Sequence, residues 1–201
     1  MTRVSTQTVA VLLVAFLVAG CSKPTKVNRI AANSTTDISG RWNDTDSRLV
    51  AEEMVRDCLN SAWYATYVAK KKTPAVIVGS VKNKSHEHID AETFTKDMER
   101  ALTNSGKVEF VASKGERDQL RDELADQAVN ASVESQKQRG EEAGADLMLI
   151  GTINSIVDQE GGKAVIFYQI NLELVQLQTN RKLWIGDKKI KKFVSKKSVK
   201  F

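Results

Sequence analysis

A long segment near the C-terminus constrains the fold most, because its apolar residues recur at every second position. From Ala164 to Gln178, one set of side chains is apolar (Ile166, Tyr168, Ile170, Leu172 and Leu174) and the alternate set is polar (Gln169, Asn171 and Glu173). Side chains of a strand point alternately to its two faces, so this pattern predicts a strand with one face on a core and the other toward solvent. The alternation changes phase near Val175, which indicates a bulge or a local end to strand pairing.

Shorter patterns along the chain predict the element order α-β-α-β-α-β-β-β. The expected helices cover 47–69, 90–103 and 116–143, and the expected strands cover 75–81, 107–112, 146–155, 164–178 and 182–190. Apolar residues at helical spacing mark the helices, and Gly161-Gly162 predicts a hairpin. Helices cannot bury their apolar stripes alone, so they must lie on the sheet. We therefore expect an α+β domain with a mixed, largely antiparallel sheet of four to five strands and flanking helices.

The N-terminus resembles the signal peptide of a bacterial lipoprotein. Arg3 precedes an uncharged apolar run, and this run of about 11 residues is shorter than the roughly 20 that a transmembrane helix needs. It ends in Val18-Ala19-Gly20-Cys21, which resembles a lipobox. Residues 1–20 are therefore expected to be cleaved and Cys21 to carry a lipid. An ordinary signal peptide followed by a chance cysteine is the alternative.

The residues after the lipobox predict where the protein is anchored and how it is divided. Ser22, rather than an aspartate, follows Cys21, and by resemblance to lipoprotein sorting in Gram-negative bacteria this favours the outer membrane, facing the periplasm. Residues 21–36 are polar without an apolar period, which predicts a lipidated flexible tether. The domain is then expected to span 37–193, and residues 194–201 form a basic tail.

The positive charge of the chain is concentrated at its C-terminal end. The whole sequence has 30 Lys and Arg against 25 Asp and Glu, and from Arg181 to Phe201 nine cations stand against one anion. Two explanations are open: contact with an anionic surface or partner, or an edge strand that its lysines protect against aggregation. Nucleic acid is not an expected partner, because an exported lipoprotein seldom meets any.

Few side chains offer chemistry, and we expect neither an enzyme nor a cofactor, metal or small-molecule substrate. Both histidines, His86 and His88, lie in one polar loop without a partner cysteine, whereas a catalytic zinc site normally takes three protein ligands from fixed elements. Once Cys21 is lipidated, Cys58 is the one thiol left, and its apolar helical surroundings predict a buried, inert side chain.

Several motifs resemble those of one family. They are DISGRWNDTDSRLV at 37–50, PAVIVG at 74–79 with Asn83, and ADLMLIG at 145–151. Together with the lipobox, they make the chain similar to the LpoB-type penicillin-binding protein activators from about Asp37 to Ile190. The Gly-Arg-Trp-Asn-Asp-Thr-Asp segment at 40–46 is the most specific part of the resemblance.

The resemblance implies a function and a fold. It implies an outer-membrane lipoprotein that docks on a class A penicillin-binding protein, a bifunctional peptidoglycan synthase, and stimulates glycan polymerisation and peptide crosslinking. It also implies a four-stranded sheet with flanking helices, similar to the N-terminal domain of TolB. The alternative is a structural or assembly lipoprotein of similar fold, such as an accessory domain of a secretion pore or a TolB-like scaffold.

The loop before the first helix is the expected partner-binding site. It contains Arg41, Trp42, Asn43, Asp44 and Asp46, and an exposed tryptophan beside an arginine suits the centre of an interface. The alternative is structural: Trp42 covers the core beneath the first helix, and Asp44 and Asp46 cap that helix.

Overall fold

The computed structural model describes residues 27–70, 72–137 and 140–195. The expected signal peptide and residues 21–26 of the expected tether, with Cys21, lie outside these residues. The chain divides into two compact units, Met1–Ser34 and Thr35–Phe201. In the described part of the first unit, the Ser34 N–H donates to the carbonyl of Ala31. None of the helices within the described residues has the length and apolar character needed to cross a membrane.

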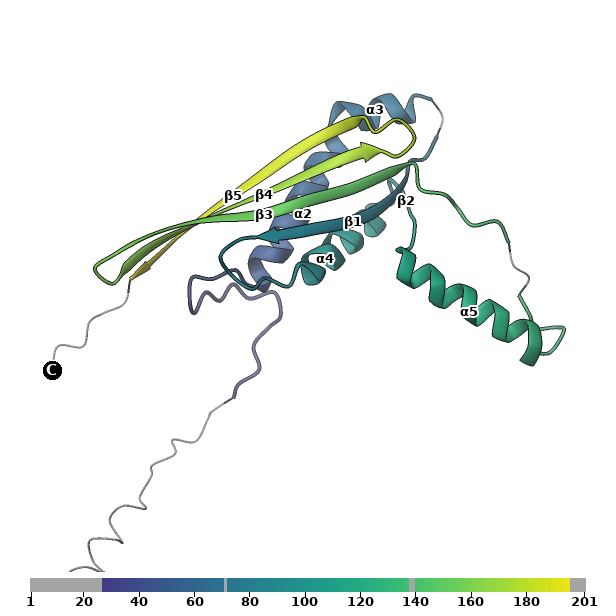
Figure 1. Ribbon diagram of the computed structural model, residues 1–201, viewed down its shortest axis with the longest axis horizontal. Helices are drawn as coiled ribbons and strands as arrows, with labels where there is room; N and C mark the ends of the chain where they lie inside the picture. Colours follow the sequence, from purple (N-terminus) through teal and green to yellow (C-terminus); the bar gives the residue numbers. More distant parts are fainter. Residues whose placement is uncertain (1–26, 71, 138–139, 196–201) are drawn as a thin grey trace, which may run out of the picture. The chain divides into compact units, whose positions relative to one another are not determined.

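The second unit is built on a five-stranded mixed sheet (Figure 1). The strands are β1 (Ala75–Lys84), β2 (Glu109–Phe110), β3 (Leu147–Glu160), β4 (Lys163–Gln176) and β5 (Lys182–Ser195), in the order β2-β1-β3-β4-β5. Strand β1 is parallel to β2 and β3, whereas β3, β4 and β5 form a long antiparallel meander. The expected α+β fold with a mixed, largely antiparallel sheet is therefore confirmed.

The second expected helix agrees with the structure, whereas the first and third differ from the prediction in length. They are α2 (Asp44–Asn60), α3 (Ala62–Val68), α4 (Ala91–Asn104) and α5 (Lys114–Asn130). The single helix expected at 47–69 is wrong, because the chain is extended at Ser61 and divides it into α2 and α3. The helix expected at 116–143 ends at Asn130, and none of its residues is buried, so no packing stabilises a longer helix.

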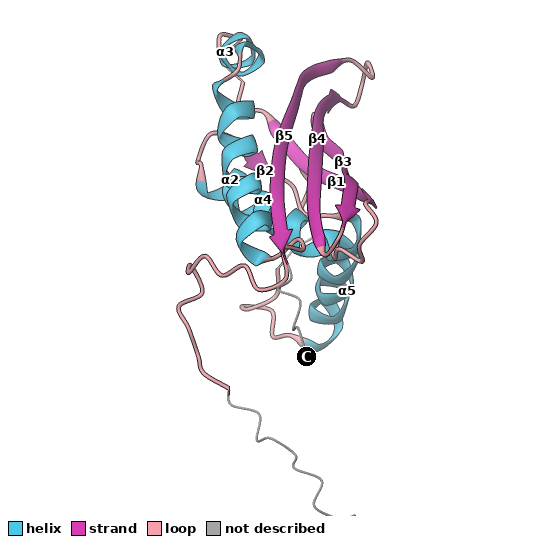
Figure 2. Cartoon of the chain, turned by 90° about the vertical axis from the view of Figure 1, so that its left-hand side faces the viewer, coloured by secondary structure: helices cyan, strands magenta, loops and turns pink. Residues whose placement is uncertain are grey.

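The core lies between one face of the sheet and helices α2 and α4 (Figure 2). The apolar set of β4 that the sequence analysis singled out is buried there, with Tyr168, Ile170 and Leu172 each at 0% exposure. The predicted change of phase is also confirmed, as a register shift between Leu174 and Val175. Cys58 is buried as expected, and burial raises the pKa of its thiol to about 12, so it is not a reactive thiolate.

The outer ends of β3, β4 and β5 extend past the helices, and we call these residues (155–160, 163–168 and 190–195) the ribbon (Figure 1). Gly161 and Gly162 connect β3 to β4 with φ values of 54° and 79°, which confirms the predicted hairpin. Strand β5 continues to Ser195, beyond its predicted end at Ile190. The first residues of the expected basic tail therefore belong to the sheet.

Candidate functional site

The loop that precedes α2 is fixed to β5 by one lysine. The Lys192 side chain is 12% exposed, and its Nζ lies 2.7 Å from Asp37 Oδ1 and 2.6 Å from Asp46 Oδ2. The same Nζ donates to the carbonyl of Arg41 at 3.1 Å. Burial lowers the pKa of Lys192, but hydrogen bonds to the two carboxylates outweigh it and hold the pKa above its ordinary value. The hydrogen bond from Lys192 likewise lowers the pKa of Asp37.

Gly40 lets this loop pass close to β5. Its φ of 73° lies in the left-handed region, and a Cβ there would come within 2.3 Å of Val194 Cγ2. A side chain at this position would therefore push the loop off the strand.

Asn43 and Asp46 use their side chains to begin α2. The Asp46 N–H donates to Asn43 Oδ1 at 3.1 Å, and the Asn43 N–H donates to Asp46 Oδ2 at 3.0 Å, which together form a capping box. Asn43 also donates through Nδ2 to Asp37 Oδ1 at 2.6 Å. Asp44 lies in the first turn of α2, where its carboxylate complements the helix dipole and its side chain is exposed.

Trp42 closes one end of the core while keeping part of its surface accessible. Its ring packs edge-on against Tyr168, with centroids 5.6 Å apart, and against Phe94 at 6.2 Å. Its backbone N–H donates to Glu87 Oε2 at 3.1 Å. Truncation of Trp42 would therefore cost stability, about 3 kcal/mol for a large aromatic ring, and could not report on partner binding alone.

The carboxylate of Glu87 connects the loop that contains His86 and His88 to the core. Its side chain is 9% exposed, and Oε1 accepts a hydrogen bond of 2.7 Å from the Tyr168 hydroxyl. Burial and this carboxylate raise the pKa of Tyr168 well above its ordinary value. His86 Nε2 lies 3.3 Å from Glu87 Oε1, and the His86 N–H donates to Ser155 Oγ at 2.9 Å. The polar loop that contains His86 and His88 is thus held by hydrogen bonds, and Asp90 after it caps α4.

We predict that Glu87→Gln destabilises the fold by about 1.5–3 kcal/mol, the usual loss for hydrogen bonds to a charged group. A glutamine accepts through one oxygen and cannot serve both Tyr168 and the Trp42 N–H. Urea unfolding at pH 7 would measure the loss. Glu92→Gln is the matched control, because Glu92 is exposed and its change should stay within about 0.5 kcal/mol. Equal losses in the two variants would contradict a stabilising role for the hydrogen bonds that Glu87 accepts from Tyr168 and from the Trp42 N–H.

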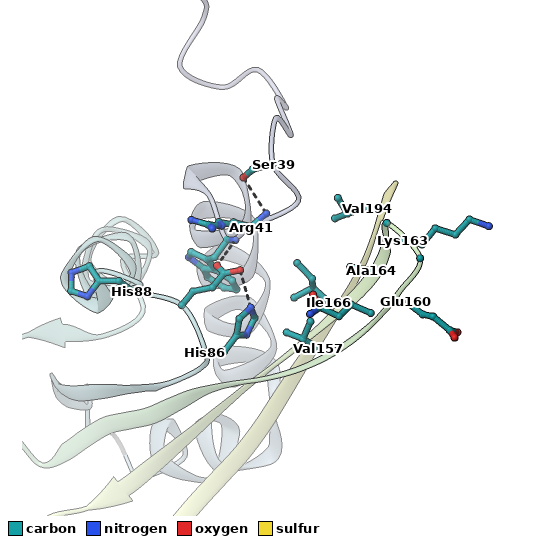
Figure 3. Close-up of a pocket in the computed structure, with 15 residues that line it drawn as sticks. Ser39, Arg41, His86, His88, Val157, Glu160, Lys163, Ala164, Ile166 and Val194 are labelled. Carbon is teal, nitrogen blue, oxygen red and sulfur yellow. Dashed lines mark hydrogen bonds and ion pairs between the residues drawn. The ribbon is translucent and has the colours of Figure 1, made fainter. Parts of the chain in front are cut away.

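A groove of about 740 Å³ lies between this loop region and the ribbon (Figure 3). Ser39, Arg41 and His86 lie on one side of it, and ribbon residues lie on the other: Val157, Ala164, Ile166 and Val194. The Arg41 side chain is exposed and has no ion pair within the described part of the chain. The groove therefore offers the Arg41 cation and the accessible part of Trp42 opposite a ribbon side that carries these apolar residues together with Gln159, Glu160 and Lys163.

The five residues expected to bind a partner thus have different roles in the structure. Arg41 and Trp42 line the groove, Asp44 is exposed beside them, and Asn43 and Asp46 are engaged within the fold. The ribbon side of the groove was not among the predicted residues. Of its residues, Ile166 was expected on the apolar face of the strand at 164–178, and Val194 was placed in the basic tail. In the described ranges, no group of three or more His, Cys, Asp or Glu side chains could hold a metal ion.

Comparison with known proteins places this domain in a family. Residues 46–190 match the family model described as "Peptidoglycan-synthase activator LpoB". Similar solved structures include the LpoB C-terminal domain from Escherichia coli (20% identity, 75% of this chain and 99% of that chain, TM-score 0.43) and that from Salmonella enterica (19% identity, 72% and 98%, TM-score 0.43). Lipoprotein GNA1162 from Neisseria meningitidis is also similar (13% identity, 62% and 87%, TM-score 0.38). No curated protein sequence matches the chain.

Proposed function

The chain belongs to the LpoB family of peptidoglycan-synthase activators, and on this premise we propose that it is an outer-membrane lipoprotein that binds and stimulates a class A penicillin-binding protein. The family match over residues 46–190 carries the proposal. A lipid on Cys21, followed by Ser22, would anchor the chain to the outer membrane with the domain in the periplasm. The domain would act by binding, so it would shift the synthase only by a higher affinity for its active state.

Within this function, we assign Arg41 and Trp42 to the docking surface, with Asp44 at its border. Arginine and tryptophan are enriched among the residues that contribute most binding energy at interfaces. Asn43 and Asp46 would act indirectly, since the capping box and the Lys192 ion pair hold the loop in place. The groove beside Arg41 would receive an apolar side chain of the partner together with a carboxylate.

Charge reversal at Arg41 tests this assignment without removing core packing. We predict that Arg41→Glu in the full mature chain weakens binding to the purified synthase by about tenfold, in line with an interface hot spot. Glycan polymerisation by the synthase should require a correspondingly higher activator concentration. The melting temperature should stay at the wild-type value, because the Arg41 side chain is exposed and has no ion pair within the described residues.

Arg181→Glu is the matched control, because Arg181 is an exposed arginine in the turn between β4 and β5. Its binding should equal that of the wild type. Wild-type binding by Arg41→Glu would remove Arg41 from the docking surface while leaving the function intact. Failure of the wild-type chain to bind or stimulate any class A synthase of its own cell would overturn the proposed function.

A further inference from the structure

The outer face of the sheet, opposite α2 and α4, carries apolar side chains at the end of the sheet away from the ribbon. The strand register groups five of them across four strands, and we call this set the outer patch: Ile77, Met148, Ile150, Val175 and Ile185. They alternate along the strands with the buried residues of the core, so they point away from it. Ile185 is 63% exposed and the other four are partly exposed, so the patch remains open to solvent.

Charged and polar residues surround the outer patch. Within it, Glu173 lies between Ile150 and Ile185, and its carboxylate pairs with Lys182 at 2.8 Å. The next row toward the ribbon consists of Lys82, Thr152, Asn171 and Asp187. The apolar surface is therefore confined to the end of the sheet where β1 begins.

Helix α5 is attached to the sheet at this same end (Figure 1). Before the helix, the Val111 N–H donates to the Val76 carbonyl at 2.9 Å. After the return connection, the Asp146 N–H donates to the Ala75 carbonyl at 2.8 Å. Both ends of the segment that carries α5 are therefore fixed beside the outer patch.

The same segment has apolar side chains but no packing. None of its described residues from 114 to 145 is buried. Leu120, which is 58% exposed, and Leu124 lie one turn apart on α5. An isolated helix of this length is marginal in water, so α5 would gain stability by packing these leucines against another surface.

The order of the strands assigns a packed α5 to the outer face. Strands β1 and β2 are parallel, and the connection between them carries α4 on the core face. The connection from β2 to β3 also joins parallel strands, but it runs back across β1 in the opposite direction and carries α5. Such crossovers are almost always right-handed, and two crossovers of one hand in opposite directions place their helices on opposite faces of the sheet. A packed α5 would therefore lie on the face that carries the outer patch.

We propose that α5 is a lid that closes over the outer patch, and that the structure shows the lid open. The 17 residues of α5 form a helix about 25 Å long, whereas the four strands of the patch span about 15 Å. The return connection, residues 131–146, can extend to about 50 Å, so it does not prevent closure.

An ion pair holds the lid in its open position. Lys96 on α4 lies 2.6 Å from Glu116 in the first turn of α5, which draws the start of α5 toward the helices of the core face. Closure would leave the groove accessible, because the groove lies at the ribbon end of the sheet. The lid therefore does not depend on the proposed function.

Chemical cross-linking in the full mature chain tests the lid. The test pair is Leu124→Cys with Ile150→Cys, treated with a short bis-maleimide, since Cys58 is buried and Cys21 is expected to carry the lipid. The control pair is Leu124→Cys with Phe193→Cys, because Phe193 is 66% exposed on the same face of the sheet but lies on the ribbon. The test pair should link within one chain at least about tenfold faster than the control pair, because closure gives its two thiols a high effective concentration.

In the Lys96→Met background, the test pair should link faster by up to about fivefold, since an exposed ion pair contributes little and its loss frees the start of α5. Both pairs should keep cooperative unfolding, because the substituted side chains are partly or largely exposed. Equal rates in the two pairs, or no linking in either, would overturn the inference. Linking between two chains, seen as a covalent dimer, would also overturn it, because α5 of a second copy would then cover the patch.

Discussion

Replacing Cys21 with alanine is expected to abolish incorporation of labelled palmitate and to release the protein from the membrane fraction. Each buried methylene of an acyl chain contributes about 0.8 kcal/mol to membrane binding, and the lipid is the anchor that the lipobox predicts. The described residues include no helix able to take over this role. The expected result is a complete change of location, the largest effect predicted for any single residue of the chain.

Cys58→Ala is the control for this experiment. Its thiol is 2% exposed in the core, so its loss should reduce stability modestly and leave labelling and location unchanged. The released Cys21→Ala protein should still stimulate the purified synthase in solution, because the docking surface belongs to the domain. In cells its activity should fall sharply, since anchoring replaces a bimolecular encounter with a high effective concentration. Persistent labelling of the alanine variant would contradict the lipobox.

The antiparallel part of the sheet could be predicted from sequence because its signals are local. The alternation in β4 identified its buried face, and Gly161-Gly162 identified the hairpin. The break between α2 and α3 could not be seen in the same way. There, the carbonyl of Cys58 accepts from the Ser61 hydroxyl at 2.6 Å and from the Trp63 indole N–H at 2.7 Å. These two side chains thus satisfy a backbone carbonyl at the end of α2. Because Ser61 and Trp63 also fit a helical spacing of residues, that spacing does not reveal the break between α2 and α3.

At the candidate site, too, contacts between residues close in sequence could be predicted, whereas contacts between residues distant in sequence could not. Helix capping was one of the two explanations for the loop, but it was expected of Asp44 and Asp46, whereas Asn43 is the N-cap and Asp46 completes the capping box. The clamp by Lys192 joins residues separated by more than half of the chain, and no local pattern predicts it. Lysines in a basic C-terminal segment were expected to be free in solution or to meet a partner. The structure instead uses most of those in β5 as internal ion pairs.

Removing the amino group of Lys192 is expected to destabilise the fold about as much as truncation of Trp42. In Lys192→Met, Asp46 keeps a carboxylate that is 10% exposed without its cation, and the carbonyl of Arg41 loses a donor. Breaking one partner of a buried ion pair typically costs 3–5 kcal/mol, and we expect about 3 kcal/mol because Asp37 is partly solvated. Urea unfolding at pH 7 would measure this. Lys189→Met is the control, and its exposed pair with Asp187 should contribute less than about 1 kcal/mol.

The pH dependence of the loss identifies its cause. The folded state lowers the pKa of Asp37 below its ordinary 3.8, so this carboxylate stabilises the fold above that value and loses its contribution as pH falls through the folded pKa. The folded state raises the pKa of Lys192, so its contribution is complete below the unfolded pKa and disappears as pH rises through the folded one. The stability curves of wild type and Lys192→Met should therefore lie furthest apart near neutral pH and approach each other as pH falls through the folded pKa of Asp37. A difference that stays constant across this acid range would mean that packing of the lysine stem, rather than its charge, holds the loop on β5.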